Sequence, residues 1–224
     1  MSPRLSRAGQ SERNRTLLLA AARRVFLERG YHGASVDQIA DAAGFSTGVV
    51  YSQFGGKADL FLALLEARIS ERAAGNALAV EGLAGGEGVA RLLEHAASVD
   101  RAEPEWGLLV IEFRVLAARD PELGRRYAAV HQRTLAGMER AVTGLYQRAG
   151  EPPPLPPADL ARLLVVVGAG ARLEQAAEPG SSLAEPGSSP ASLLAGQLAR
   201  LIAGRPASSV SAPDEKGPHD HDHR

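Results

Sequence analysis

Residues 34–61 read ASVDQIADAAGFSTGVVYSQFGGKADLF, and a single glycine separates two short apolar-periodic segments within them. Ser35 stands three residues before Gln38, which is the spacing of a capping box and predicts the start of a helix. Gly44 ends that helix, because glycine readily adopts the left-handed conformation that closes a helix. A second short helix follows and stops at Gly55-Gly56. The stretch therefore predicts two short helices joined by a tight turn.

A longer helix precedes this pair and another follows it. Residues 12–29 carry apolar side chains at three-to-four spacing, and Gly30 ends the segment. Lys57 opens the helix after the pair. Because the two central helices are too short to be stable alone, their apolar residues must pack against the first helix. The expected core consists of Leu18, Ala22, Val25, Phe26, Val36, Ile39, Ala40, Ala43, Val50 and Phe54.

Beyond residue 75 the pattern changes to longer helices. The run EPPPLPP at 151–157 predicts an extended connector, since successive prolines block helix formation. The segment AEPGSS, written twice between residues 177 and 189, predicts a loop. No segment alternates as a strand, so the fold class is predicted to be all-α. The expected helices are 87–101, 105–119, 122–148, 159–174 and 191–202.

Composition is that of a globular protein, with 45% hydrophobic and 23% charged residues. No apolar run approaches the roughly 20 residues of a membrane span, and the first residues lack the apolar segment of a signal peptide. The absence of cysteine excludes disulfides and thiolate metal sites, and it is compatible with a reducing compartment. We therefore expect a cytoplasmic protein that does not contact a membrane.

Positive charge is concentrated at the N-terminal end, although the whole chain has a net charge of −1. Residues 1–60 carry eight basic and five acidic side chains, whereas the remaining residues carry 17 basic and 21 acidic ones. Neutralisation of phosphates drives nucleic-acid affinity, so this distribution is typical of a DNA-binding domain on a neutral body. It is equally compatible with an arginine-rich surface that only faces solvent.

The helix pair has the spacing of a helix-turn-helix, in which the second helix enters the major groove of DNA. Because its apolar residues must face the first helix, the side carrying Thr47, Gly48, Val49, Ser52 and Gln53 remains free. Hydroxyl and amide groups can reach base edges or phosphates there, and the valine can contact a thymine methyl. The Tyr51 hydroxyl can meet a phosphate, and Lys57 adds charge at a helix start that already favours anions.

The quoted stretch, together with LLLAAARRVFLERGYHGAS at 17–35, closely resembles the DNA-binding signature of the TetR family of bacterial regulators. The resemblance covers residues 12 to about 72. It implies that the second helix of the pair is the recognition helix, that Ser35 and Val36 approach the DNA backbone, and that Lys57 clamps a phosphate. The predicted DNA-binding residues are Ser35, Val36, Ser46, Thr47, Gly48, Val49, Tyr51, Ser52, Gln53 and Lys57.

Two positions depart from the family pattern and leave the operator sequence open. Gln53 stands where the family often has histidine, and Val49 stands where a small polar residue or alanine is common. The framework is otherwise retained. Its members are Gly44, Gly48, Tyr51, Phe54, Lys57 and Leu60.

The resemblance also implies an all-helical body that binds a small-molecule effector and dimerises through the last two long helices. These would be the helices near 159–174 and 191–202. The first of them is apolar nearly all round, which fits burial against a partner and equally a core helix of a monomer. A dimer would supply the second half-site about 34 Å away.

The predicted organisation therefore has four parts. They are a flexible basic arm at 1–11, a three-helix DNA-binding domain at 12–72 with its helix-turn-helix at 35–54, a helical ligand-binding and dimerisation domain at 73–204, and a disordered tail at 205–224.

Candidate effector-binding residues lie on the central helices of the body. They are Trp106, Glu112, Phe113, Arg114, Tyr127 and His131. Trp106 and Phe113 stand seven residues apart and share a helix face, which is typical of a core as well as of a ligand wall. Glu112 lies in the apolar run VIEF, where a buried unpaired carboxylate would be costly. It therefore serves either a cationic ligand or a structural partner such as Arg114 or Arg91.

The sequence gives little support for a metal site or an enzyme active site. The tail residues 219–223 alternate histidine and aspartate, but a chain end has no surrounding residues to orient metal ligands, so we expect no metal site. The sequence contains no P-loop or HExxH motif, so we expect neither an enzyme nor a cofactor.

The resulting hypothesis is a bacterial, nucleoid-associated repressor that binds a pseudo-palindromic operator in double-stranded DNA as a homodimer and is released by a small-molecule effector. Two alternatives remain open. One is a transcriptional activator, and the other is a helical ligand carrier or adaptor without DNA binding.

Overall fold

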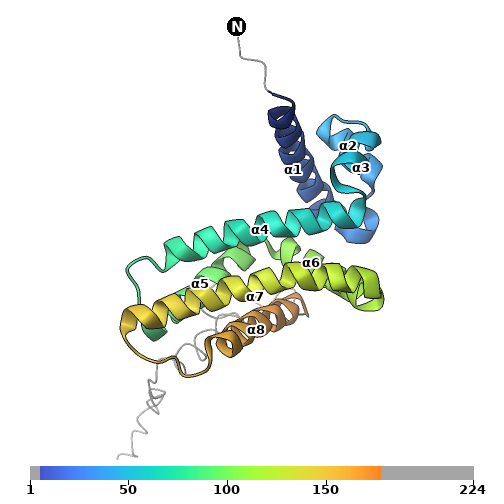
Figure 1. The fold of residues 1–224 in the computed structure, drawn as a ribbon. Helices are drawn as coiled ribbons and strands as arrows, with labels where there is room; N and C mark the ends of the chain where they lie inside the picture. The colour runs from blue at the N-terminus through green and yellow to red at the C-terminus, as the bar shows by residue number, and fades with distance from the viewer. Residues whose placement is uncertain (1–5, 178–224) are drawn as a thin grey trace, which may run out of the picture.

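The computed structural model describes residues 6–177, and within that range every regular element is a helix, as predicted (Figure 1). The predicted helix 191–202, the tail from 205 and its histidines and aspartates lie outside the described residues. The helices are α1 (Arg7–Gly33), α2 (Val36–Ala43), α3 (Thr47–Phe54), α4 (Lys57–Ala79), α5 (Gly85–Ala102), α6 (Pro104–Arg119), α7 (Pro121–Ala149) and α8 (Pro157–Ala177).

Helix α1 begins earlier than predicted. Ser6 caps it by accepting a hydrogen bond from the backbone N–H of Gly9 at 3.2 Å, so residues 7–11 are helical and the prediction of a flexible arm is wrong for them. Residues 7–11 are mostly polar, and apolar periodicity does not reveal the polar end of a helix. Gly30 breaks the helical path as predicted, with φ of +69°, and a short turn completes α1 as far as Gly33.

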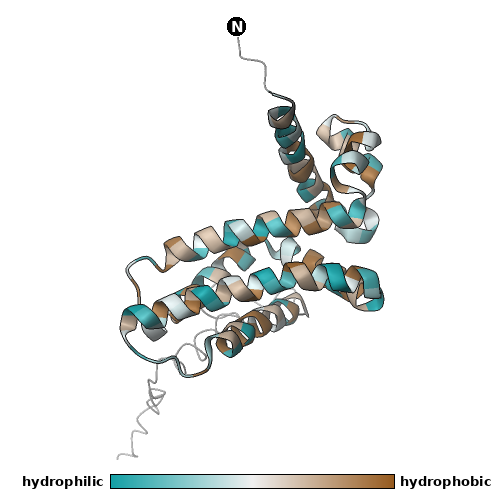
Figure 2. Ribbon diagram, in the orientation of Figure 1, coloured by the Kyte–Doolittle hydropathy of each residue, from teal (hydrophilic) through white to brown (hydrophobic). Residues whose placement is uncertain are grey.

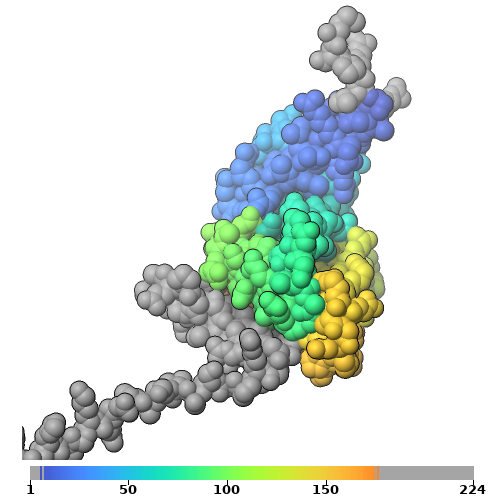
Figure 3. Space-filling model, turned by 90° about the vertical axis from the view of Figure 1, so that its left-hand side faces the viewer, coloured from blue at the N-terminus to red at the C-terminus, as the bar shows by residue number. Residues whose placement is uncertain are grey.

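The helices form a small head and a larger body (Figure 1). Helices α1, α2 and α3 make the head, which lies over the N-terminal end of α4. Helix α4 runs unbroken from the head along the body beside α7, while α5 and α6 lie behind these two and α8 lies on the other side of α7. The side view also shows the head stacked on one end of the body (Figure 3). The predicted domain boundary after residue 72 therefore falls inside α4.

Two hydrophobic cores hold these helices together, and the first crosses from head to body. It joins Phe26 of α1, Ile39 of α2 and Val50 of α3 to Phe61 of α4 and Phe113 of α6, all essentially inaccessible to solvent. The second core lies at the far end of the body, among α4, α5, α7 and α8. Apolar residues accordingly follow the inner sides of the helices in Figure 2. All ten predicted core residues of the head lie in or against the first core.

Helix α7 is the centre of the body, because it contacts α4, α5, α6 and α8. Its closest approach to α5 is at Gly88, where an added Cβ would lie 2.0 Å from Cδ2 of the fully buried Leu145. No helix within residues 6–177 has the length and apolarity needed to cross a bilayer.

We expect Gly88→Ala to destabilise the body. Overpacking a core typically costs about 1–3 kcal/mol, which outweighs the roughly 1 kcal/mol that alanine gains over glycine inside a helix. Thermal and urea unfolding should both show the loss. Gly137→Ala is the matched control, because a Cβ there meets only the Arg140 guanidinium, at 3.9 Å. If the two variants are equally stable, Gly88 is not packed against Leu145 as described.

Candidate functional site

The helix pair α2–α3 is built as its sequence predicts. The Ser35 hydroxyl accepts from the N–H of Gln38 at 3.2 Å, and the Gln38 side chain accepts from the N–H of Ser35 at 3.0 Å, which completes the capping box. Gly44 follows α2 with φ of +73°, and the next N–H, of Phe45, donates to Ala40 at 2.9 Å. These local bonds fix the turn between the helices before any ligand is present.

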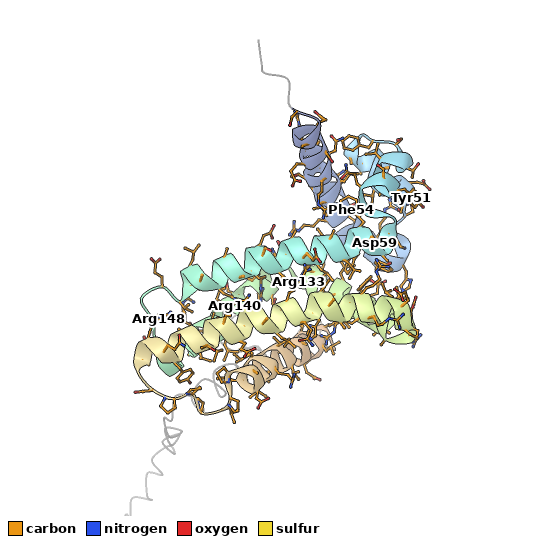
Figure 4. The ribbon with its side chains drawn as sticks, viewed as in Figure 1. Tyr51, Phe54, Asp59, Arg133, Arg140 and Arg148 are labelled. Carbon is orange, nitrogen blue, oxygen red and sulfur yellow. The ribbon has the colours of Figure 1, made fainter. Side chains whose placement is uncertain are left out.

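Helix α3 has one buried side and one exposed side. Val50 and Phe54 are buried against α1 and α2, whereas the side chain of Tyr51 is 55% exposed and lies on the outside of the head (Figure 4). The predicted DNA-binding residues divide accordingly. Ser46, Gly48, Tyr51 and Ser52 are exposed, and Ser35, Val36, Thr47, Val49, Gln53 and Lys57 are half-buried. The outer side of α3 thus presents hydroxyl groups, a phenol and a glycine to solvent.

Two contacts attach α3 to α1, and sequence pattern gave no sign of either. The Gln53 amide donates to the Ser11 hydroxyl at 3.0 Å. The guanidinium of Arg15 lies 4.6 Å from the centre of the Phe54 ring, a cation–π geometry. Arg13 and Arg29, also on α1, are exposed and form no ion pair within the described residues. Helix α3 itself carries no charged residue, so the free positive charge of the head is on α1.

Lys57, the predicted phosphate clamp, also makes contacts inside the protein. Its ammonium group donates to the carbonyl oxygens of Tyr31 and Ala34, both at 2.9 Å, and lies 4.6 Å from the centre of the Tyr31 ring. Burial lowers the pKa of Lys57, and the nearby Glu112 carboxylate opposes that shift. These two bonds use two of the three N–H donors of the ammonium group, so Lys57 holds the end of α1, and its contact with a DNA phosphate stays a prediction.

Glu112 holds the same segment from the body side. Its carboxylate accepts from the backbone N–H groups of Tyr31 at 2.9 Å and His32 at 3.0 Å. The left-handed Gly30 allows this approach, since a Cβ there would lie 3.0 Å from a Glu112 oxygen. The predicted pairing of Glu112 with Arg114 or Arg91 is therefore wrong, because backbone groups distant in sequence satisfy the carboxylate.

A second link between head and body passes through Glu103, at the start of α6. One of its oxygens forms an ion pair with Arg23 of α1, and the other accepts from Arg68 of α4 at 2.7 Å. The two arginines come from sequence positions 45 residues apart, which is why sequence spacing could not reveal the link. Head and body are thus joined by two carboxylates as well as by the shared core.

The body contains a cavity of about 710 Å³ among α4, α5, α6, α7 and α8. Four of the six predicted effector-binding residues line it, namely Trp106, Arg114, Tyr127 and His131. The other two do not. Phe113 is fully buried in the first core, with its ring centre 4.4 Å from that of Phe61, and Glu112 is directed at the head. The volume lies within the roughly 300–1,000 Å³ of small-molecule sites.

The cavity wall is rich in arginine. Arg72 of α4 and Arg172 of α8 share one carboxylate, that of Asp100, at 3.2 and 2.7 Å. Arg114 lines the cavity without an ion pair or hydrogen bond within residues 6–177. Burial lowers the pKa of His131 and Arg114 lowers it further, so this histidine stays neutral at neutral pH. The sequence pattern indicated Arg114 and the aromatic members of the wall, but not the other arginines, which lie on three different helices.

Comparison with known proteins places the head in a family. Residues 18–64 match the family model described as bacterial regulatory proteins, tetR family. The chain is 44% identical over 73 residues to the transcriptional activator FasR of Mycolicibacterium smegmatis, which is 33% of this chain and 30% of FasR. It is 34% identical over 125 residues to the transcriptional repressor AcnR of Corynebacterium efficiens, which is 54% of this chain and 60% of AcnR. The matches therefore span less than two thirds of these relatives.

Solved structures resemble the fold over a larger part of the chain. A protein from Rhodococcus sp. described as a TetR-family transcriptional regulator has a TM-score of 0.70 and 21% identity, covering 84% of this chain and 98% of that one. The regulator FadR from Bacillus subtilis, solved in complex with stearoyl-CoA, has a TM-score of 0.64 and 17% identity with the same coverage. At these identities the likeness establishes the fold.

We expect Glu112→Ala to destabilise the junction between head and body. The N–H of the buried Tyr31 would lose its acceptor, and an unsatisfied buried donor costs about 1–3 kcal/mol, whereas the N–H of the exposed His32 can bind water instead. The melting temperature should fall, and the amide of Tyr31 should exchange with solvent faster. Glu105→Ala, an exposed carboxylate on the same helix, is the control and should change neither quantity strongly. Unchanged exchange at Tyr31 would contradict the assigned hydrogen bonds.

Proposed function

Because the chain carries an N-terminal domain of the tetR family of bacterial regulatory proteins and the fold of solved regulators, we propose that it is a ligand-responsive transcription regulator that binds operator DNA as a dimer. The observation that carries the proposal is the exposed polar side of α3, held outward by buried Val50 and Phe54. We place the protein in the bacterial cytoplasm, at the nucleoid.

In this proposal α3 enters the major groove. Thr47 and Ser46 at its start can donate to base edges or phosphates, and Val49 can contact a thymine methyl. The Ser52 hydroxyl donates to the Val49 carbonyl at 2.9 Å, so it can accept from a base edge. The Tyr51 phenol reaches a phosphate at the groove edge. Arg13 and Arg29 of α1 supply the non-specific attraction to the DNA backbone, since α3 has no charge of its own. Lys57 supports the interface indirectly by holding the end of α1.

Regulation follows from the position of α6 between the cavity and the head. Trp106, Val110 and Arg114 recur every four residues on the side that lines the cavity, whereas Glu112 faces the kink of α1. A ligand that shifts α6 would therefore move the carboxylate that holds the head. By linkage, a ligand that weakens operator binding must itself bind less tightly when the operator is bound.

The sign of regulation is proposed as repression, with the effector releasing the operator. Both signs occur among the relatives, because AcnR is a repressor and FasR is an activator. The alternative of a ligand carrier without DNA binding is disfavoured by the exposed polar side of α3 and the unpaired arginines of α1.

We expect Tyr51→Ala to weaken operator binding by about tenfold, which is the loss of roughly 1.4 kcal/mol from one good contact. A mobility shift on the intergenic DNA upstream of the gene measures this. Tyr51→Phe separates the hydroxyl from the ring, and Leu78→Ala, a 74% exposed residue on the distant part of α4, is the control. Absence of binding by the unaltered protein at low salt would favour the carrier instead.

Dimerisation is proposed through α8, which keeps an apolar strip exposed. Val166 is 60% and Leu173 is 49% exposed, and seven residues place them on one side of the helix. The second predicted dimerisation helix, 191–202, lies outside the described residues.

We expect Val166→Glu with Leu173→Glu to shift the protein from dimer to monomer in sedimentation velocity, because the pair would bring like charges together across a two-fold interface. Val115→Glu is the control, since Val115 is a 50% exposed residue on α6. A sedimentation coefficient unaffected by the α8 pair would place the interface elsewhere.

A further inference from the structure

The cavity is long and follows the axes of two helices. Its wall includes residues from Leu65 to Ala77 on α4, residues 80–82 of the turn after it, and residues from Tyr127 to Arg148 on α7. At 1.5 Å per residue, the α7 part alone spans roughly 30 Å. Glycines at 137, 144 and 168 leave this length open, because no side chain projects from them. The space is therefore suited to an extended molecule rather than a compact one.

Aliphatic side chains line most of that length. Ile69, Val110, Val130, Leu164 and Val165 come from four helices and offer apolar contact without hydrogen-bonding groups. An extended ligand with an aliphatic body would be desolvated along this wall, and burial of apolar area is the main source of affinity in such sites.

The electrostatic character of the wall is positive. Seven arginines and two carboxylates line the cavity, and two of these arginines, Arg68 and Arg133, pair with Glu103 and Glu66 outside the wall. Asp100 balances only one of its two partners, Arg72 and Arg172, whose side chains are 27% and 26% exposed. Figure 4 shows three further arginines, Arg133, Arg140 and Arg148, along the side of α7 that faces α4. No cationic ligand would be attracted to this wall.

Three arginines of the wall form no ion pair within the described part of the chain, namely Arg114, Arg140 and Arg148. Arg140 and Arg148 are exposed to water, whereas Arg114 is half-buried. Arg114 and Arg172 both act on the Tyr127 phenol, lowering its pKa against the larger rise caused by burial. A half-buried cation without a partner is costly, and an anion placed beside it would remove that cost.

We propose that the cavity binds an extended aliphatic anion, with its carboxylate or phosphate between Arg114 and Arg172 and its aliphatic body directed along α4 and α7 toward Gly144. This deepens the proposed function, on which it rests for the role of the ligand as effector. The anionic group would lie against α6, the helix that carries Glu112 and Glu103, so occupancy acts directly on the element that holds the head.

Trp106 makes the proposal measurable without DNA, because it is the only tryptophan of the chain and lines the cavity. The probes are decanoate, 1-decanol and decylamine, which share a chain length and differ in charge. Titration of Trp106 fluorescence should show saturable binding of decanoate at least tenfold tighter than of decanol, and weaker binding still of decylamine. Equal affinities for the three probes, or no saturable change with decanoate, would overturn the proposal.

Substitutions in the cavity wall test where the anionic group of the ligand binds. Arg114→Gln should weaken decanoate binding at least tenfold and change the affinity for decanol by less than twofold. The control is Arg140→Gln, because Arg140 is an exposed residue of the same wall farther along α7. It should change the affinity for either probe by less than twofold. Gly137→Leu should abolish binding of both probes by filling the middle of the cavity, and it keeps the helix because leucine favours it more than glycine. Circular dichroism checks that each variant is folded. Loss of decanoate binding in Arg140→Gln but not in Arg114→Gln would overturn the assignment.

A mobility shift with the same protein on the intergenic DNA distinguishes failure of the ligand assignment from failure of the regulator proposal. If decanoate binds selectively but the intergenic DNA is not bound, the regulator proposal fails and the ligand assignment stands. If the DNA is bound but decanoate is not preferred over decanol, the ligand assignment fails and the regulator proposal stands.

Discussion

The contact between the Glu112 carboxylate and the kinked end of α1 is the constraint on which the arrangement of this protein depends. Gly30 leaves the helical conformation, and the N–H groups that follow it point toward α6. Lys57 donates to carbonyl oxygens of the same segment. The N–H groups and the carbonyl oxygens of this short stretch of backbone are therefore both hydrogen-bonded to charged side chains. Charge-assisted hydrogen bonds of this kind are stronger than neutral ones and directional.

Around this contact the first core becomes continuous between head and body. The rings of Phe26, Tyr31, Phe61 and Phe113 meet at the junction, with edge-to-face or tilted geometry between most pairs. The Arg23–Glu103–Arg68 link adds a second attachment beside it. The head thus shares one core with the body, and in the proposed regulation a shift of α6 or of the first part of α4 would reach α3 through these packed and hydrogen-bonded groups.

Several features of the head could be predicted because their signals are local. The capping box at Ser35, the left-handed Gly44 and the apolar spacing of α2 and α3 each involve residues a few positions apart. The site was less predictable. Trp106, Tyr127 and His131 were found by their aromatic character, but the arginines of the cavity wall other than Arg114 lie on separate helices and no spacing connects them. Lys57 was assigned to DNA from its position in a motif, and its partners within the protein are carbonyl groups 23 and 26 residues earlier.

The chain alone thus settled the all-α class, the bounds of most helices to within a few residues and the identity of the head core, since helix formation and capping depend on near neighbours. Only the tertiary structure decided what Glu112, Glu103, Lys57 and Arg114 do. A charged side chain half-buried in a helical protein takes whatever partner packing brings to it, and that partner is set by how the helices cross rather than by any pattern along the sequence.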